Sequence, residues 1–233
     1  MKIVYKQVEQ GLIDAILRGE FQVGTPLQSE RDLADRFGVN RATVREALEH
    51  LAQAGWVTVS ERRATVVNDF WVNGSLDVIS SMARSAENFP QDLAINLLEV
   101  RAELAPHYAR LAVQNDAAQL IACLARARKL ADTPSAVAKF DWELHLTMAI
   151  LSGNKFYPLL LNSFAKLYFR LRGHFFATDV FRAQARSFYQ KLMHAALNED
   201  PDAAGEITRS AMNKRLHIFR RQVEERADKE NET

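Results

Sequence analysis

The chain has 233 residues and a formal net charge of +1, with no apolar run of about 18 residues and a single cysteine, Cys123. This length suits one large or two modest domains, and the composition excludes a membrane span and an internal disulfide. We therefore expect a cytoplasmic globular protein without a signal peptide. Its net charge is too small for the protein as a whole to attract nucleic acid, so any nucleic-acid binding must depend on where its basic residues lie.

The first 28 residues predict one amphipathic helix followed by a connector. Apolar residues recur at helical spacing over residues 3–18, and Gly19 ends the pattern. Gly24 and Pro26 then mark an irregular segment. The expected buried stripe consists of Val4, Val8, Leu12, Ile13, Ile16 and Leu17.

Residues 29–56 predict two short helices around a tight turn. Ser29 can cap the first helix, Gly38 can end it in a left-handed conformation, and Asn40 can cap the second. An inward stripe follows at Val44, Ala47, Leu48 and Leu51. Arg41 and Arg45 lie outside this stripe, one turn apart.

A helix, a glycine turn and a second helix opened by arginines form the pattern of a helix-turn-helix that reads the major groove of DNA. The same pattern also fits an ordinary helical hairpin with solvated arginines, and periodicity alone leaves both interpretations open. On the first interpretation the candidate DNA contacts are Arg31, Asn40, Arg41, Ala42, Thr43 and Arg45.

Residues 56–59 and 64–67 are short β-branched runs, which predict a hairpin, or wing, whose tip carries Arg62 and Arg63. These two arginines are further candidate DNA contacts, whereas Glu61 fits a solvated turn. Phe70 and Trp71 lie where this first part meets a joint over residues 71–90, and they are expected to couple the two parts of the chain.

Beyond residue 91 the sequence shows only helical patterns, over about 92–113, 116–131, 135–151, 155–173, 178–198 and 202–226. We therefore predict a mostly α protein, with a winged helix-turn-helix at 1–70, the joint at 71–90, and an all-α bundle of six or seven helices at 91–228.

Charged residues interrupt the apolar stripes of this bundle. Asp141 and His145 lie one turn apart on an apolar face, and Arg101 and Arg215 lie on inward faces of two other helices. Because burying such groups without partners is costly, they either form an ion-pair network or line a ligand cavity that accepts an anionic or carbonyl group. Aromatic candidates for its wall are Tyr168, Phe175, Phe188, Tyr189 and Phe219.

Asp141 and His145 also have the spacing of two metal ligands on one helical face. Two ligands do not make a site, and His194, His217 or His107 would have to complete it. An enzyme is disfavoured, because the sequence has no glycine-rich phosphate loop and no nucleophile elbow.

The stretch from residue 28 to residue 56 resembles the winged helix-turn-helix signature of the GntR family of bacterial transcription regulators. The matching segments are Gln28-Ser29-Glu30-Arg31-Asp32-Leu33-Ala34, Val39-Asn40-Arg41-Ala42-Thr43-Val44-Arg45-Glu46-Ala47-Leu48 and Gly55-Trp56. The resemblance implies a homodimer that binds a palindromic double-stranded operator.

The helical half is similar to the effector domain of the FadR branch of this family. Many members of that branch hold a metal with one Asp and three His, and Asp141 and His145 match the first two positions. The other two fall at Gln190 and Arg215, so the resemblance does not imply a bound metal or another required cofactor. A fatty-acid-responsive group within the branch shares Asn68-x-Phe70-Trp71 and Ser152-Gly153-Asn154.

This second resemblance implies long-chain acyl-CoA as the effector, with release from the operator when it binds. Tyr168, Phe175, Tyr189 and Phe219 would then line the cavity. A regulator that senses a small carboxylate, with or without a metal, is the alternative that the family also offers.

Overall fold

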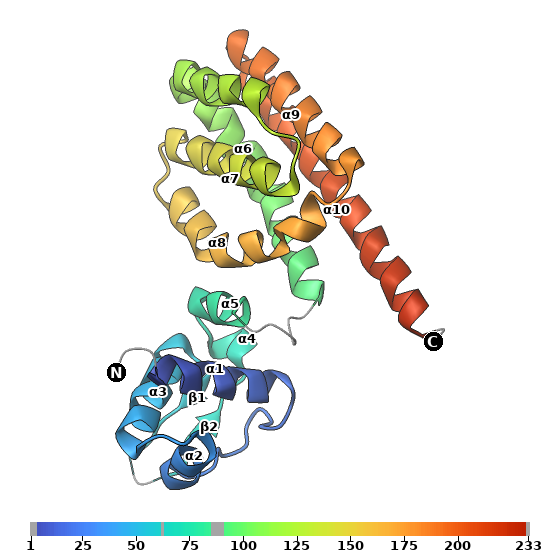
Figure 1. The fold of residues 1–233 in the computed structure, drawn as a ribbon. Helices are drawn as coiled ribbons and strands as arrows, with labels where there is room; N and C mark the ends of the chain where they lie inside the picture. Colours follow the sequence, from blue (N-terminus) through green and yellow to red (C-terminus); the bar gives the residue numbers. More distant parts are fainter. Residues whose placement is uncertain (1–3, 62, 85–90, 232–233) are drawn as a thin grey trace. The chain divides into compact units, whose positions relative to one another are not determined.

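The computed structural model describes residues 4–61, 63–84 and 91–231, and the chain divides into two compact units, Met1–Phe89 and Pro90–Thr233 (Figure 1). The first unit therefore includes most of the residues that the sequence assigned to a joint. None of the helices in the described ranges combines the length and the apolar composition that crossing a bilayer needs.

The first unit contains α1 (Val4–Leu17), α2 (Glu30–Phe37), α3 (Arg41–Ala54) and the antiparallel pair β1 (Val57–Thr58) and β2 (Val66–Val67). In that pair Val57 lies opposite Val67. The core between the helices includes Val8, Leu12, Ile13, Leu33, Val44, Leu51 and Trp56. The predicted winged helix-turn-helix is thereby confirmed, although Val4 is exposed because it lies at the first position of α1.

Two further helices, α4 (Phe70–Asn73) and α5 (Leu76–Met82), complete the first unit, and α5 packs against α1 and α3. The Trp56 indole donates a hydrogen bond to the Ser81 hydroxyl at 3.0 Å, and the Phe70 ring lies 4.6 Å from the Trp56 ring. Trp71 is 58% exposed. Phe70 is thus anchored inside the first unit, and a mechanical role for Phe70 and Trp71 stays a prediction.

The second unit is an all-α bundle of α6 (Gln91–Ala125), the 3-10 turn η1 (Arg126–Lys129), α7 (Pro134–Leu151), α8 (Phe156–Phe175), α9 (Asp179–Leu197) and α10 (Pro201–Asn231). The predicted break near residue 115 appears as a kink at Asp116, where φ is −157°. The helix α10 runs beside both α6 and α9 (Figure 1). The bundle confirms the predicted fold class.

Apolar spacing over residues 92–113 predicts that Val100 faces the core together with Leu93 and Leu97. This prediction is wrong for Val100, which is 41% exposed, whereas Leu93 and Leu97 are buried. Val100 lines a shallow groove between α6 and α10 instead of the core.

Candidate DNA-binding surface and polar centre of the bundle

Side-chain caps define both helices of the helix-turn-helix. Ser29 Oγ accepts from the Asp32 backbone N–H at 3.2 Å and donates to the Asp32 carboxylate at 2.6 Å. Gly38 ends α2 with φ at 64°, a conformation that favours glycine. Asn40 Oδ1 then accepts from the Thr43 backbone N–H at 2.9 Å. These caps fix where α3 begins, and with it the direction in which its first residues point.

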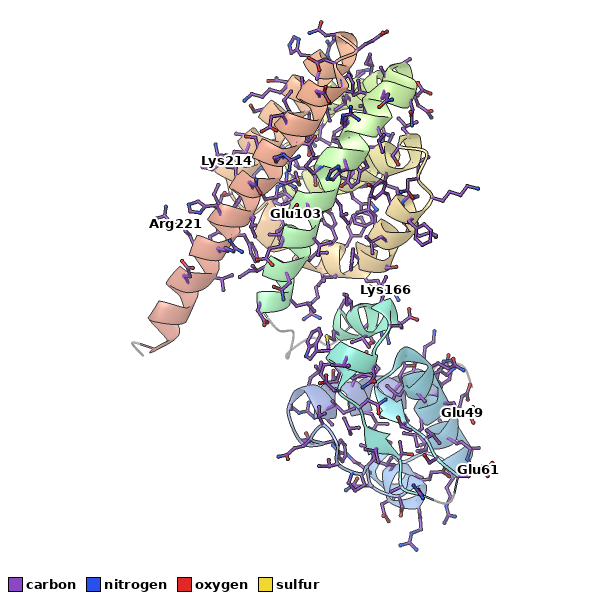
Figure 2. All side chains as sticks on the ribbon, turned by 180° about the vertical axis from the view of Figure 1, so that it is seen from behind. Glu49, Glu61, Glu103, Lys166, Lys214 and Arg221 are labelled. Atoms are coloured by element: carbon purple, nitrogen blue, oxygen red, sulfur yellow. The ribbon has the colours of Figure 1, made fainter. Side chains whose placement is uncertain are left out.

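Most of the predicted DNA contacts are exposed. Arg31, Asn40, Arg41, Ala42, Arg45 and Arg63 are exposed, and Thr43 is half-buried. Arg62 lies outside the described residues. Glu61, in the turn after β1, is exposed, as expected for a solvated position (Figure 2). Asn40 and Thr43 also serve the cap, so their side chains do not extend freely from the helix.

The two arginines of α3 differ in their partners. Arg45 donates from Nε and Nη2 to the two carboxylate oxygens of Glu30 on α2, at 3.1 and 2.7 Å, and this pairing lowers the pKa of Glu30. Among the described residues no carboxylate oxygen lies within 4.0 Å of the Arg41 guanidinium. One edge of the planar Arg45 guanidinium is therefore paired within the protein, whereas the Arg41 guanidinium has no such pairing among the described residues.

Asp141, on α7, is the centre of the polar cluster in the bundle. Arg215 on α10 donates to both of its carboxylate oxygens, at 3.1 and 3.2 Å. Arg101 on α6 donates at 3.4 Å, and the hydroxyls of Tyr168 on α8 and Tyr189 on α9 donate at 3.0 and 3.2 Å. The side chains of Asp141, Arg101 and Arg215 are all buried. Side chains from α6, α8, α9 and α10 thus meet at one carboxylate.

His145, one turn after Asp141, belongs to the same cluster through a residue that the sequence analysis missed. Its Nδ1 lies 2.7 Å from the hydroxyl of Tyr108, a buried residue on α6. Its Nε2 lies 3.9 Å from Asp141 Oδ2. Tyr108 follows Arg101 by seven residues, which places both on one face of α6. The seven-residue spacing between Arg101 and Tyr108 is the feature of the sequence from which Tyr108 could have been predicted.

Burial and charge shift the pKa values of this cluster. Burial alone raises the pKa of Asp141, but Arg215 and Arg101 outweigh it, so the carboxyl group stays ionised with a pKa well below its usual range. Burial, reinforced by Arg101, lowers the pKa of His145 to about 3. Burial also raises the pKa values of Tyr108, Tyr168 and Tyr189. The cluster therefore carries two positive charges and one negative charge near neutral pH.

The predicted aromatic wall is present, but it packs closely. Phe175 lies 6.0 Å from the Tyr168 ring and 5.3 Å from the Phe219 ring, and all three are buried. Phe188 stacks on His145 at 6.1 Å. Of the two alternatives from the sequence, the ion-pair network is the one that forms in this structure. The ligand role of these residues stays a prediction.

Two grooves border α9, and each has at least one residue of this centre in its lining. A groove of about 550 Å³ lies between α9 and α10, and Phe188 and Arg215 are part of its lining. Lys191 and Lys214 line it as well, and Lys214 is labelled in Figure 2. A second groove, of about 440 Å³, lies between η1 and α9 and reaches Tyr189, with the exposed His194 at its side.

The residues at the candidate metal position do not fit a metal ion. Arg215 and two phenols already take both oxygens of Asp141, and a divalent cation would face two buried guanidinium groups. His194 lies in the outer groove instead of beside Asp141 and His145, and no three His, Cys, Asp or Glu side chains gather at a metal-binding distance within the described ranges. We derive no role for a metal.

Comparisons with known proteins agree with this architecture. Residues 4–67 match the family described as bacterial regulatory proteins, gntR family, and residues 68–228 match the FadR C-terminal domain. The fatty acid metabolism regulator protein of Shewanella pealeana is 35% identical over 193 residues, which cover 82% of this chain and 80% of that relative. Its counterpart in Escherichia coli is 37% identical over 185 residues, with 79% and 77% covered.

A solved structure supports the fold alone. Its title concerns Lar and the agr system of Listeria monocytogenes, and it superposes with a TM-score of 0.62 at 17% identity, covering 95% of this chain and 98% of that one. With both parts of the chain matched to family models, this protein belongs to the gntR family of bacterial regulatory proteins, carries a FadR C-terminal domain, and is a DNA-binding transcription regulator, not an enzyme.

Proposed function

We propose that this regulator controls genes of fatty-acid metabolism, and that long-chain acyl-CoA bound in its helical unit releases it from its operator. The observation that carries the proposal is the match of residues 68–228 to the FadR C-terminal domain, together with relatives named fatty acid metabolism regulator protein at 35% and 37% identity. We further propose that it acts in the cytoplasm, where its DNA would be.

The groove between α9 and α10 is the proposed entrance for the effector. Its volume of about 550 Å³ lies within the range of about 300–1,000 Å³ that is usual for ligand sites. Phe188 and Ile207 supply apolar surface, while Lys191 and Lys214 supply positive charge for the phosphates of coenzyme A. Arg215 links the groove to Asp141, so an acyl chain that enters between the helices must disturb the polar centre.

Tyr168, Phe175, Tyr189 and Phe219 would contact the ligand only after this rearrangement, because all four are buried now. Such a requirement suits a regulator. An effector shifts an equilibrium only when it binds one arrangement better than the other, and a coupling of roughly 1–3 kcal/mol is typical. The proposal therefore includes a ligand-free bundle that the Asp141 cluster holds closed.

On DNA we propose a homodimer that places two copies of α3 in successive major grooves of a palindromic operator. Residues 1–70 would bind the duplex and residues 91–228 the effector, with 71–90 between them. Arg41 would read base edges, Arg45 would hold phosphate, and Arg31, Asn40, Ala42, Thr43, Arg62 and Arg63 would complete the contacts.

Fluorescence anisotropy of a labelled FadR-type operator duplex, titrated first with protein and then with oleoyl-CoA, tests this proposal. We expect release of the duplex at micromolar oleoyl-CoA or below, and no release by free coenzyme A, which has the phosphates without the chain. Binding of the duplex without any response to oleoyl-CoA would refute the effector and leave the DNA half intact. Equal release by coenzyme A would show that the acyl chain is not recognised.

A further inference from the structure

Glu30, the first residue of α2, binds one of the two exposed arginines of α3. Its two carboxylate oxygens accept hydrogen bonds from Arg45 Nε at 3.1 Å and from Arg45 Nη2 at 2.7 Å. These two nitrogens form one edge of the planar guanidinium, so the pairing fixes the plane of the group as well as its position. Arg45 lowers the pKa of Glu30 most, by hydrogen bonding, and the charge of Arg41 acts in the same direction. One carboxylate therefore lies among the arginines that we expect to contact DNA.

The cap of α2 does not require this pairing. Ser29 and Asp32 make the side-chain cap, and the Glu30 carboxylate takes no part in their hydrogen bonds. The side chains of Glu30 and Arg45 are 34% and 64% exposed, and ion pairs that are this open to solvent typically add little to stability. What the pair does determine is where the Arg45 guanidinium lies. We therefore look for its effect in what Arg45 can bind.

The pairing suits Arg45 for a phosphate better than for a base. Arginine recognises guanine with two parallel hydrogen bonds, which requires that the guanidinium can turn until one edge faces the base. In Arg45 the edge formed by Nε and Nη2 is already held by Glu30, and Nη1 is the nitrogen outside this pairing. A phosphate oxygen can accept from Nη1 while both bonds to Glu30 persist, and such a contact carries no direct sequence information.

We propose that Glu30 is a specificity-determining residue, which keeps Arg45 on the phosphate backbone and leaves base reading on α3 to Arg41. Glu30 acts through Arg45 and does not itself contact DNA. This inference rests on the proposed placement of α3 in the major groove. Without Glu30 the Arg45 guanidinium is free to turn, and, one helical turn after Arg41, it reads a further base pair.

Glu30→Ala removes both acceptor oxygens and should therefore add a base preference. The unaltered full-length chain and the variant each bind a pool of duplexes with a randomised central sequence, and the recovered duplexes are sequenced. We expect Glu30→Ala to favour guanine at one additional position of each half-site by roughly 5- to 150-fold, the discrimination that a bidentate arginine–guanine pair typically gives. The double variant Glu30→Ala with Arg45→Ala should lose this preference, because the guanidinium that reads the base is gone.

Two further variants separate the position of Arg45 from the loss of a negative charge. Glu30 raises the pKa of Arg45 by hydrogen bonding and by charge, whereas Glu49 on α3, labelled in Figure 2, does so by charge alone. Glu49→Ala should therefore strengthen binding to every duplex and leave base preference unchanged. Glu30→Gln removes the same charge as Glu30→Ala but keeps one acceptor oxygen for Arg45, so its new preference should be weaker than that of Glu30→Ala.

The same selection distinguishes failure of this inference from failure of the proposed function. An unchanged base preference in Glu30→Ala, with duplexes still recovered, would overturn the role of Glu30 and leave the DNA contacts intact. The same new preference in Glu49→Ala would assign the effect to charge, and its persistence in the double variant would assign it to a residue other than Arg45. If the unaltered chain recovers no preferred sequence, both the inference and the proposed DNA contacts are wrong.

Discussion

Replacement of Asp141 by asparagine tests the physical account of the polar centre most directly. Asparagine keeps the shape of the side chain and one of the two oxygens to which Tyr168 and Tyr189 separately donate. It removes the only negative charge that faces Arg101 and Arg215 among the described groups of the cluster. The change therefore removes the charge and one hydrogen-bond acceptor while it leaves the volume of the side chain almost unchanged.

The magnitude follows from the contacts. At 3.1 and 3.4 Å from Asp141, and with an effective dielectric constant of about 20, each arginine gains roughly 5 kcal/mol of Coulomb attraction before desolvation is counted. Removing one partner of a buried pair typically costs about 3–5 kcal/mol, because the remaining charge stays buried. We expect Asp141→Asn to lower the free energy of unfolding of the helical unit by that amount.

Urea is the suitable denaturant because it is uncharged and does not screen the cluster, as guanidinium chloride would. The protein has two compact units, so the transition of the helical unit must be resolved by comparing far-UV circular dichroism with tryptophan fluorescence. Trp142, whose ring lies 5.0 Å from Tyr168, reports on the bundle.

The double variant Asp141→Asn with Arg101→Met supplies the control. Removing a surplus arginine should recover part of the lost stability, since fewer uncompensated charges remain buried. A loss below about 1 kcal/mol for Asp141→Asn would show that the carboxylate does not hold the cluster. Strict additivity of the two substitutions would contradict their coupling through charge.

Three further predictions concern other parts of the molecule. The pKa of His145 is about 3 in the folded chain against an ordinary 6.5, so the unfolded chain binds this proton at a higher pH than the folded chain does. The free energy of unfolding should therefore fall by up to about 1.4 kcal/mol per pH unit as the pH drops from 6.5 toward 3. His145→Phe should remove this part of the pH dependence in urea titrations. Arg41→Ala should lower operator affinity by about 1–3 kcal/mol and relax base preference. The Arg45 guanidinium is partly occupied by Glu30, so Arg45→Ala should weaken binding to operator and random duplex alike and reduce the slope of log affinity against log salt concentration by about 1 in anisotropy titrations. A changed base preference in Arg45→Ala would contradict this division. Gly55→Ala should destabilise the first unit by more than Gly19→Ala. Both glycines have positive φ, but only at Gly55 would an added Cβ collide with a backbone oxygen, that of Asn73, so equal melting temperatures of the two variants would refute this expectation.

Sequence reasoning located the helix-turn-helix because its signals are local. Ser29, Gly38 and Asn40 act on backbone groups within a few residues, so their cap geometry can be read from spacing. The pairing of Arg45 with Glu30 was not predictable in this way. It joins residues 15 positions apart across a turn, and only the packing of α2 against α3 sets their distance.

The amino-acid sequence by itself determined that the chain is two units, that the second is all α, and that Asp141, His145, Arg101 and Arg215 lie on inward faces, because periodicity reports which side of a helix is buried. Tertiary structure decided what those residues do. It assembled five side chains from α6, α8, α9 and α10, Tyr108 among them, around Asp141 and His145 on α7, and it formed an ion-pair network in place of an open cavity. Helical spacing fixes a face, whereas the partner on that face depends on which helices the bundle brings together.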